Sequence, residues 1–426
     1  MWRIASVTAA VALALAACAP RGQPERLGGT VSVLAVWGGE ELESFRAMLQ
    51  PFEERTGVTV EYEGTRDLNA VLTTRVQAGN PPDVAVLPGP GQLAEFARQG
   101  HLVPLDDVVD AERMRQEYAQ TWLDLGTVDG RLYGVFVKTS LKGLVWYNRP
   151  AFEAAGYTVP QTWDDLMRLT ERIAADGRTP WCVGLESGSA SGWPATDWIE
   201  VLLLKAAGPE VYDRWYRHEI SWEDSAVRQA WERFAQVVGE PRYVYGGRQG
   251  VLATNFAQAA FPLFSDPPGC YLHHQATFIQ DFIQQQFPNL RPGEDFDFFP
   301  FPAVDARYQN AVVAAGDLVG VFRDTPQARA LVRYLASAEA QAVWVRRGGA
   351  LSPNRQVSLD GYPDPLNRRA AEVLRSAEVA RFDASDLMPE AVNSAFWRAT
   401  LDFVQEPRRL GALLARLERV AREAYR

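Results

Sequence analysis

Residues 30–98 alternate between short apolar segments and longer amphipathic ones, and this alternation limits the possible folds more than any other feature of the chain. The segment 40–55 has apolar side chains at Leu42, Phe45, Leu49 and Phe52, a spacing typical of a helix with one buried face. The pattern predicts strands at 30–36, 58–62 and 83–87, and helices at 40–55, 67–77 and 92–98. Strands separated by helices at such short spacing indicate an α/β layer with parallel strands.

The rest of the chain mixes both patterns. Asp129-Gly130 predicts a turn, and Thr162 with Asp165 three residues later predicts a helix N-cap. A helical region is expected at 196–234, with Thr196 or Asp197 as its cap. Further strands are expected at 131–137, 143–147 and 312–322, a strand–loop region at 261–302, and helices at the end of the chain.

The N-terminus has the features of an export signal. Arg3 precedes a mostly apolar run at 4–17, which is shorter than the roughly 20 residues that span a bilayer. Leu15-Ala16-Ala17 before Cys18 resembles the lipobox of bacterial lipoproteins, which implies cleavage before Cys18 and lipidation of its sulfur. An ordinary signal peptide with an incidental cysteine is the alternative. We therefore expect a signal at 1–17, a lipidated tether at 18–29, and a location outside the cytoplasm, lipid-anchored to the membrane or periplasmic.

Charge and cysteine content narrow the function further. The chain has 53 Asp and Glu against 43 Lys and Arg, a net charge of −10. It has no basic stripe interleaved with aromatic residues, so we expect no nucleic-acid partner. Beyond Cys18 only Cys182 and Cys270 remain, and in an oxidising compartment they predict one disulfide. Two buried free thiols are the alternative.

An ordered set of short motifs resembles family 1 of the extracellular solute-binding proteins, the sugar-capturing components of bacterial ABC importers. After the lipobox, the motifs are Val36-Trp37-Gly38-Gly39-Glu40, Asn80-Pro81-Pro82-Asp83-Val84, Asp129-Gly130-Arg131-Leu132-Tyr133-Gly134-Val135, Trp146-Tyr147-Asn148, Thr162-Trp163-Asp164-Asp165-Leu166 and Ala314-Ala315-Gly316-Asp317. Details similar to the α-glucoside branch are Gly64-Thr65-Arg66-Asp67-Leu68, Asp266-Pro267-Pro268-Gly269-Cys270, Gly348-Gly349-Ala350-Leu351-Ser352-Pro353-Asn354-Arg355 and Asp386-Leu387-Met388-Pro389. One departure is Phe136, where the family often has proline.

The resemblance implies a fold, a function and partners. The implied fold is α/β, a two-lobe periplasmic-binding-protein fold of the maltose-binding type with hinge strands between the lobes. By analogy the first lobe comprises 30–140 plus 312–350, and the second 141–311 plus 351–426. The implied function is capture of a carbohydrate, an α-glucoside such as maltose, trehalose or sucrose, for an ABC permease. We expect a lipid-anchored monomer without catalysis, cofactor or metal.

Sugar recognition needs strong planar donors and acceptors for the hydroxyls and flat aromatic surfaces for the CH faces of the ring. Residues of these types in loops beside predicted strands, or near the expected lobe crossings, are the candidates. They are Trp37, Glu40, Arg66, Asp67, Gly89, Lys138, Tyr147, Trp193, Trp198, Phe264, Asp266, Asp317 and Arg355. Structural alternatives exist: Glu40 complementing a helix dipole, Arg66 in a surface ion pair, Trp193 as a core anchor, and Arg355 in an interlobe ion pair.

Other chemistries have weaker support. His273-His274 has no third ligand at metal spacing, so a structural or cleft-lining role is expected for the pair. No nucleophile motif or phosphate-binding glycine loop occurs. Two alternatives stay open: an exported carbohydrate-active enzyme, which would need two carboxyl groups flanking one bond, and the same fold binding a polyamine, an anion or glycerol phosphate.

Overall fold

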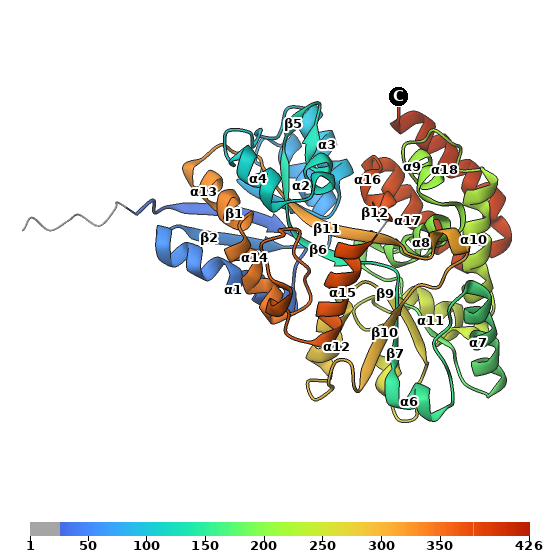
Figure 1. The fold of residues 1–426 in the computed structure, drawn as a ribbon. Helices are drawn as coiled ribbons and strands as arrows, with labels where there is room; N and C mark the ends of the chain where they lie inside the picture. Colours follow the sequence, from blue (N-terminus) through green and yellow to red (C-terminus); the bar gives the residue numbers. More distant parts are fainter. Residues whose placement is uncertain (1–25, 378) are drawn as a thin grey trace, which may run out of the picture.

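The computed structural model describes residues 26–377 and 379–426 (Figure 1). The predicted signal at 1–17, Cys18 and the tether up to residue 25 lie outside the described residues. A six-stranded sheet has the order β12-β11-β3-β1-β2, with β6 paired to β11. Its strands are β1 (Thr30–Ala35), β2 (Thr59–Gly64), β3 (Val84–Leu87), β6 (Gly134–Leu141), β11 (Ala311–Val321) and β12 (Val379–Phe382). β1 is parallel to β2 and β3, as the sequence predicts, whereas β11 is antiparallel to β3 and β6.

Helices cover this sheet, and together they form the first half of the molecule, on the left of Figure 1. The helices are α1 (Gly39–Thr56), α2 (Leu68–Gln77), α3 (Pro90–Arg98), α4 (Ala111–Glu117), α5 (Gln120–Leu125), α13 (Pro326–Leu335) and α14 (Ala338–Arg347). Phe45, Leu49 and Phe52 of α1 are buried against β1 and α14, because their spacing places them on one helix face. A hairpin of β4 (Thr127–Val128) and β5 (Arg131–Leu132) turns at Asp129-Gly130, where both φ angles are positive.

The second half is built on a four-stranded sheet of order β10-β7-β9-β8. Its strands are β7 (Leu144–Asn148), β8 (Trp181–Cys182), β9 (Leu272–Gln275) and β10 (Phe296–Pro300). Its helices are α6 (Arg149–Ala154), α7 (Trp163–Ala175), α8 (Trp193–Ala207), α9 (Pro209–Tyr216), α10 (Ser225–Val238), α11 (Gly247–Ala253), α12 (Ile279–Gln286), α15 (Pro365–Ser376), α17 (Glu390–Gln405) and α18 (Leu410–Ala424). Thr162 and Asp165 form the predicted capping box at the start of α7.

β6 and β11 join the two halves. Figure 1 shows both strands running across the middle of the molecule, and after β6 the chain enters β7 of the second sheet through Lys142-Gly143. α16 (Ala384–Leu387) also lies at this junction, since Leu387 packs on the core of the first half and Ala384 belongs to that of the second. The molecule therefore has the two-lobed α/β architecture that the sequence predicts, although the predicted lobe boundaries at 140, 312 and 350 stay predictions.

Three sequence expectations differ from the structure. Neither Thr196 nor Asp197 caps α8, because the helix starts earlier, at Trp193-Pro194 after Gly192, and proline suits the first turn of a helix. The expected strand–loop region at 261–302 also contains α12. The expected strand at 131–137 is divided into β5 and β6, and β6 continues to Leu141.

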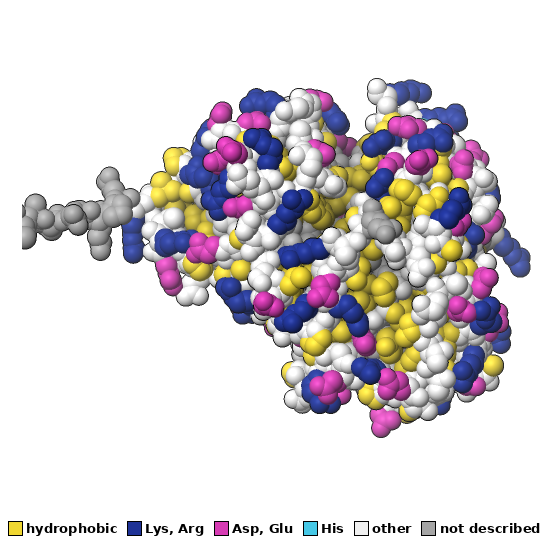
Figure 2. All heavy atoms as spheres, in the orientation of Figure 1, with side chains coloured by type: hydrophobic (Ala, Val, Ile, Leu, Met, Phe, Trp, Pro, Cys, Tyr) yellow, Lys and Arg dark blue, Asp and Glu magenta, His cyan; other side chains and the backbone are white. Residues whose placement is uncertain are grey.

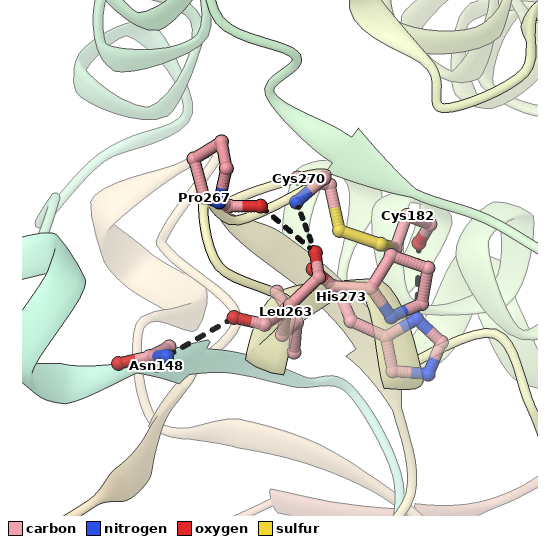
Figure 3. Close-up of a disulfide and its surroundings, with 9 residues drawn as sticks. Asn148, Cys182, Leu263, Pro267, Cys270 and His273 are labelled. Atoms are coloured by element: carbon pink, nitrogen blue, oxygen red, sulfur yellow. Dashed lines mark hydrogen bonds between the residues drawn. A yellow bond between two sulfur atoms is a disulfide. The ribbon is translucent and has the colours of Figure 1, made fainter.

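Cys182 and Cys270 form the predicted disulfide, with their Cα atoms 5.6 Å apart (Figure 3). The bridge joins the end of β8 to the segment before β9. Beside it the His273 ring nitrogen Nδ1 lies 3.0 Å from the carbonyl oxygen of Cys182, and burial lowers the pKa of His273 to about 4. His274 packs on Trp198 with ring centroids 4.4 Å apart. Within residues 26–377 and 379–426, no cluster of His, Cys, Asp or Glu is arranged to hold a metal.

Candidate functional site

A cavity of about 180 Å³ lies between the two halves and is lined by residues from both, together with β6 and β11. First-half elements contribute the ends of β1, β2 and β3, where the carboxyl ends of parallel strands meet at one sheet edge. Its polar and charged lining residues are Glu41, Arg66, Asn69, Gln92, Lys138, Thr139, Ser140, Lys142, Ser187, Ser189, Asp197, Asp317, Asp383, Ser385, Asp386, Glu390 and Asn393. Its aromatic lining residues are Trp37, Trp193, Phe256, Phe278 and Trp397.

On the first-half side, Glu41 is held between two cations. Its carboxylate lies 2.5 Å from Lys138 Nζ and 3.2 Å from the Arg66 guanidinium. Burial opposes ionisation of Glu41, but Lys138 and Arg66 outweigh it and lower the pKa of this carboxyl. Burial also opposes the charge on Lys138, yet Glu41 and Asp317 raise its pKa. Glu41 and Lys138 are therefore both charged at neutral pH.

Asp317 and Trp37 complete this cluster. Asp317 on β11 lies opposite Lys138 on β6, at a shift in the β6–β11 register, and 3.9 Å separates Lys138 Nζ from its carboxylate. The indole N–H of Trp37 donates to Asp317 across 3.3 Å. Burial raises the pKa of Asp317, and Glu41 adds to that effect. We define the first-half cluster as Glu41, Arg66, Lys138 and Asp317.

Lys142 is the centre of a second charged group, the hinge cluster of Lys142, Asp197, Glu200 and Asp383. Lys142 Nζ donates to Asp197 across 2.8 Å and also contacts Asp383. Burial raises the pKa of Asp197 to about 7, whereas Lys142 outweighs burial at Asp383 and lowers its pKa. Burial raises the pKa of Glu200, whose carboxylate accepts from the backbone N–H of Ala384 at 2.8 Å. The charge of the buried Lys142 is therefore stabilised by these three carboxyl groups and by Asp386, whose own pKa burial raises.

Aromatic side chains from the second half form the apolar part of the wall. The Trp193 ring lies 5.1 Å from Phe256 and 6.0 Å from Phe278, measured between centroids. Lys142 Nζ lies 5.2 Å from the Trp193 ring centroid, and the Arg66 guanidinium lies 5.1 Å from that of Phe256. Two cations thus lie against aromatic rings in the cavity wall, an arrangement that suits a ligand with both hydroxyl groups and apolar faces.

Six of the thirteen candidates line this cavity: Trp37, Arg66, Gly89, Lys138, Trp193 and Asp317. Two more, Asp67 and Glu40, are sequence neighbours of lining residues. Asp67 accepts from the backbone N–H of Ser189 across 3.4 Å, a contact between the halves. The Glu40 carboxylate points instead towards Arg347, and 3.9 Å separates the two charged groups. Glu40 and Glu41 are consecutive residues of α1, so their side chains leave the helix in different directions, and Glu41 is the one that faces the cavity.

The other five candidates lie away from the cavity, and their packing explains why. Tyr147 faces Phe152 and Phe299, and Trp198 is packed against Trp181 inside the second-half core. Phe264 packs on Phe287 and Phe296. Asp266 and Arg355 are exposed on loops outside the cavity lining. The side chain of the neighbouring Asn354 turns inward instead, with its amide 2.7 Å from Glu117.

Sequence reasoning missed the hinge cluster. A signal for Lys142 was present, since it directly follows β6 and continues the spacing of two from Lys138 and Ser140, and such positions share a strand face. Only three lysines occur in the whole chain, and two of them lie in the cavity wall. Asp386 belongs to a motif quoted for the α-glucoside branch, but Asp383 had no comparable signal, because its position depends on β12 joining the sheet edge beside β11.

Comparison with known proteins agrees with this architecture. The model of the bacterial extracellular solute-binding protein family matches residues 38–342. The osmoprotective compounds-binding protein GgtB of Synechocystis sp. is 43% identical over 375 residues, 88% of each chain. The α-glucosides-binding periplasmic protein AglE of Rhizobium meliloti is 42% identical over 388 residues, which are 88% of this chain and 84% of the relative.

Solved structures share the fold. The bacterial solute receptor AcbH superposes with a TM-score of 0.82 at 20% identity, over 94% of this chain and all of that one. The maltose-bound MalE3 of T. maritima superposes with a TM-score of 0.72 at 18% identity, over 93% of this chain and all of that one. With two relatives above 40% identity across most of its length, and a family model that matches more than half of it, the chain belongs to the bacterial extracellular solute-binding protein family.

Proposed function

We propose that the cavity captures a neutral carbohydrate outside the cytoplasm, an α-glucoside such as maltose, trehalose or sucrose, for delivery to the membrane subunits of an ABC importer. The observation that supports this most is the wall itself: both halves supply charged hydrogen-bonding groups, and Trp193 supplies a flat ring beside them. Sugar hydroxyls and CH faces need this combination. The names of the two relatives, which state α-glucosides and osmoprotective compounds, agree with it.

Binding by closure follows from contacts between the halves. The side-chain amide of Asn69 on α2 donates to Glu390 on α17 across 2.6 Å. Asp67 of the first half accepts from the backbone N–H of Ser189 in the second half. A ligand that receives hydrogen bonds from both walls favours the closed form over the open one, because only the closed form offers all of these partners at once.

A thermal-shift screen with maltose, trehalose and sucrose tests the proposal. The cognate sugar at about 100 times its Kd should add about 2.7 kcal/mol to the free energy of unfolding. Trp193→Ala should remove the shift, whereas Tyr245→Ala, which changes an exposed aromatic residue outside the cavity lining, should keep it. Absence of a shift with all three sugars would contradict the proposal, and release of glucose at catalytic rates would favour an exported enzyme.

Membrane attachment through Cys18 and a monomeric state are part of the same proposal. The described residues contain no helix that is both long and apolar enough to cross a bilayer. On the face drawn in Figure 2, acidic and basic side chains are interspersed over both halves, without a patch of one sign.

Mass spectrometry of the mature protein should find a lipid on Cys18, and Cys18→Ala should release the protein from the membrane. Size-exclusion chromatography with light scattering should give the mass of one chain.

A further inference from the structure

Three polar atoms at one end of the cavity have no hydrogen-bond partner among residues 26–377 and 379–426. They are the side-chain nitrogen Nε2 of Gln92, the side-chain oxygen Oδ1 of Asn393 and the indole nitrogen Nε1 of Trp397. All three residues line the cavity, and Gln92 and Asn393 are only 6% and 5% exposed. Buried polar groups are nearly always paired in folded proteins, because an unpaired one loses its hydration without compensation.

Packing brings these residues to the same end of the cavity. Gln92 lies on α3, and Glu95 one turn later accepts from the backbone N–H of Glu390 across 3.0 Å, which fixes α3 beside the start of α17. The approach is close: a Cβ on Gly91 would lie 2.3 Å from the carbonyl oxygen of Met388. Asn393 and Trp397 follow Glu390 at helical spacing on α17, so they share its inward face.

The loop before α8 closes the other side of this end. A Cβ on Gly192 would lie 2.2 Å from the carbonyl oxygen of Trp397, so the start of α8 with Trp193 packs directly against α17. Trp193 and Trp397 thus both border a region whose free polar atoms come from the two halves of the molecule.

We propose that Gln92, Asn393 and Trp397 form a second recognition subsite, which binds a neutral hydroxyl-bearing unit of the ligand. This inference rests on the proposed function and adds that the ligand has at least two polar units. The first unit contacts the first-half cluster, and the second contacts the α3–α17 end of the cavity. Gln92 ends the loop after the predicted strand at 83–87, where Gly89 is the predicted candidate, whereas Asn393 and Trp397 follow no predicted strand.

The types of the three atoms select the chemistry. The Gln92 amide and the Trp397 indole donate, whereas Asn393 Oδ1 accepts. A hydroxyl group donates and accepts, so a pair of hydroxyls can satisfy all three atoms. A carboxylate or a fully ionised phosphate only accepts, and would leave Asn393 Oδ1 unpaired in a wall that also contains Asp386 and Glu390. An ammonium only donates and would leave Gln92 and Trp397 unpaired.

Nearly isosteric variants test the subsite by isothermal titration calorimetry with maltose, trehalose and sucrose. The variants Gln92→Met, Asn393→Leu and Trp397→Phe should each raise the Kd of the sugar that the wild-type protein binds by about fivefold or more, since each removes one hydrogen bond to the ligand. Gln99→Met is the matched control, an exposed glutamine at the end of the same helix, and should leave Kd within twofold of the wild type.

A second measurement separates a binding role from a structural one. Each variant replaces a buried unpaired polar atom with an apolar one, so the melting temperature of the ligand-free protein should stay the same or rise. Unchanged affinity in all three variants would overturn the subsite while leaving the proposed function intact. Lower affinity together with a lower melting temperature of the ligand-free variants would also overturn it, as the sign of a structural role. A wild-type protein that binds none of the sugars would contradict both proposals.

Discussion

Lys138 lies on β6 and Lys142 follows the end of that strand four residues later, and both line the cavity, but their surroundings differ in charge balance. In the first-half cluster, Glu41 is shared by two cations, Lys138 and Arg66. In the hinge cluster, Lys142 is the cation that contacts Asp197 and Asp383, with Glu200 close behind. In the first-half cluster Lys138 and Arg66 lower the pKa of Glu41, although burial raises that of Asp317; in the hinge cluster burial raises the pKa of Asp197 and Glu200, and Lys142 lowers that of Asp383. Cations outweigh burial at Glu41 and Asp383, whereas burial prevails at Asp197, Glu200 and Asp317.

The largest expected effect is on stability, from removing Lys142. Lys142→Met leaves Asp197 and Asp383 buried without their cation, and breaking a buried pair in this way costs about 3–5 kcal/mol. The loss should be larger at pH 8 than at pH 5, because protonation relieves the unpaired carboxylates. Urea unfolding at the two pH values measures it.

Lys205→Met is the control for this experiment. Lys205 is also buried, but its Nζ donates to the carbonyl oxygen of Gln309 at 2.6 Å, and burial lowers its pKa to about 8. Its removal strands no carboxylate and should cost clearly less. Equal losses for the two variants would show that burial of a lysine, and not the acid excess around Lys142, sets the effect.

Removing Lys138 should destabilise the protein less and affect binding more. In Lys138→Met, Arg66 still contacts Glu41 at 3.2 Å, so we expect a loss of about 1–3 kcal/mol in the free energy of unfolding, towards the lower end for a buried charge that keeps one partner. The cognate sugar should bind at least tenfold more weakly by calorimetry. A loss of stability as large as that of Lys142→Met would remove the contrast between the two clusters.

The pH dependence of stability should differ in sign between Asp197 and Glu41. The pKa of Asp197 rises from 3.8 in the unfolded chain to about 7 in the fold, so the folded state holds the extra proton and stability falls as pH rises from about 4 to about 7. Glu41 has a lowered pKa, so its contribution is present above its unfolded value of 4.5 and is lost only in more acidic solution.

Asp197→Asn should therefore flatten the fall between pH 4 and 7 in a series of melting curves, and Glu41→Gln should leave that slope unchanged. Some slope should remain in Asp197→Asn, because burial also raises the pKa of Asp281 to about 7. An unaltered slope in Asp197→Asn would mean that Asp197 does not exchange its proton in this range.

The smallest expected effect on stability is that of Arg66→Gln. The Arg66 side chain is 40% exposed, and ion pairs with such exposure contribute about 0–1 kcal/mol. Its effect should instead fall on the ligand, with a several-fold weaker Kd, while the free energy of unfolding changes by less than about 1 kcal/mol. A larger destabilisation than that of Lys138→Met would reverse our assignment of the main partner of Glu41.

Local signals account for the parts of the fold that the sequence predicts. The three β–α units of residues 30–98 follow from apolar spacing and from glycines such as Gly57, which takes a left-handed C-cap conformation after α1. The capping box of Thr162 and the turn at Asp129 are equally local. The start of α8 escaped prediction because Trp193-Pro194 begins the helix without a side-chain cap, which leaves the more obvious Thr196 in its first turn.

The site residues also divide into those that local sequence signals predict and those that depend on contacts between distant segments. Trp37, Arg66 and Gly89 follow strands of the predicted parallel sheet, so their common edge could be inferred. Asp383 and Asn393 reach the cavity only because β12 pairs with β11 and α17 packs beside α3, contacts between segments more than 60 residues apart. Tyr147 and Trp198 have suitable chemistry for a sugar, but the packing of their own half turns them into its core.

The crossing strands have a mechanical consequence. Lys138 lies on β6 and Asp317 lies opposite it on β11, so two charged groups of the cavity wall belong to the strands that join the halves. Any flexing of that joint alters the spacing of these two side chains, and any solute that fixes their spacing stiffens the joint. The shape of the cavity wall and the flexibility of the crossing strands thus depend on the same residues, and a substitution of Lys138 or Asp317 should change both.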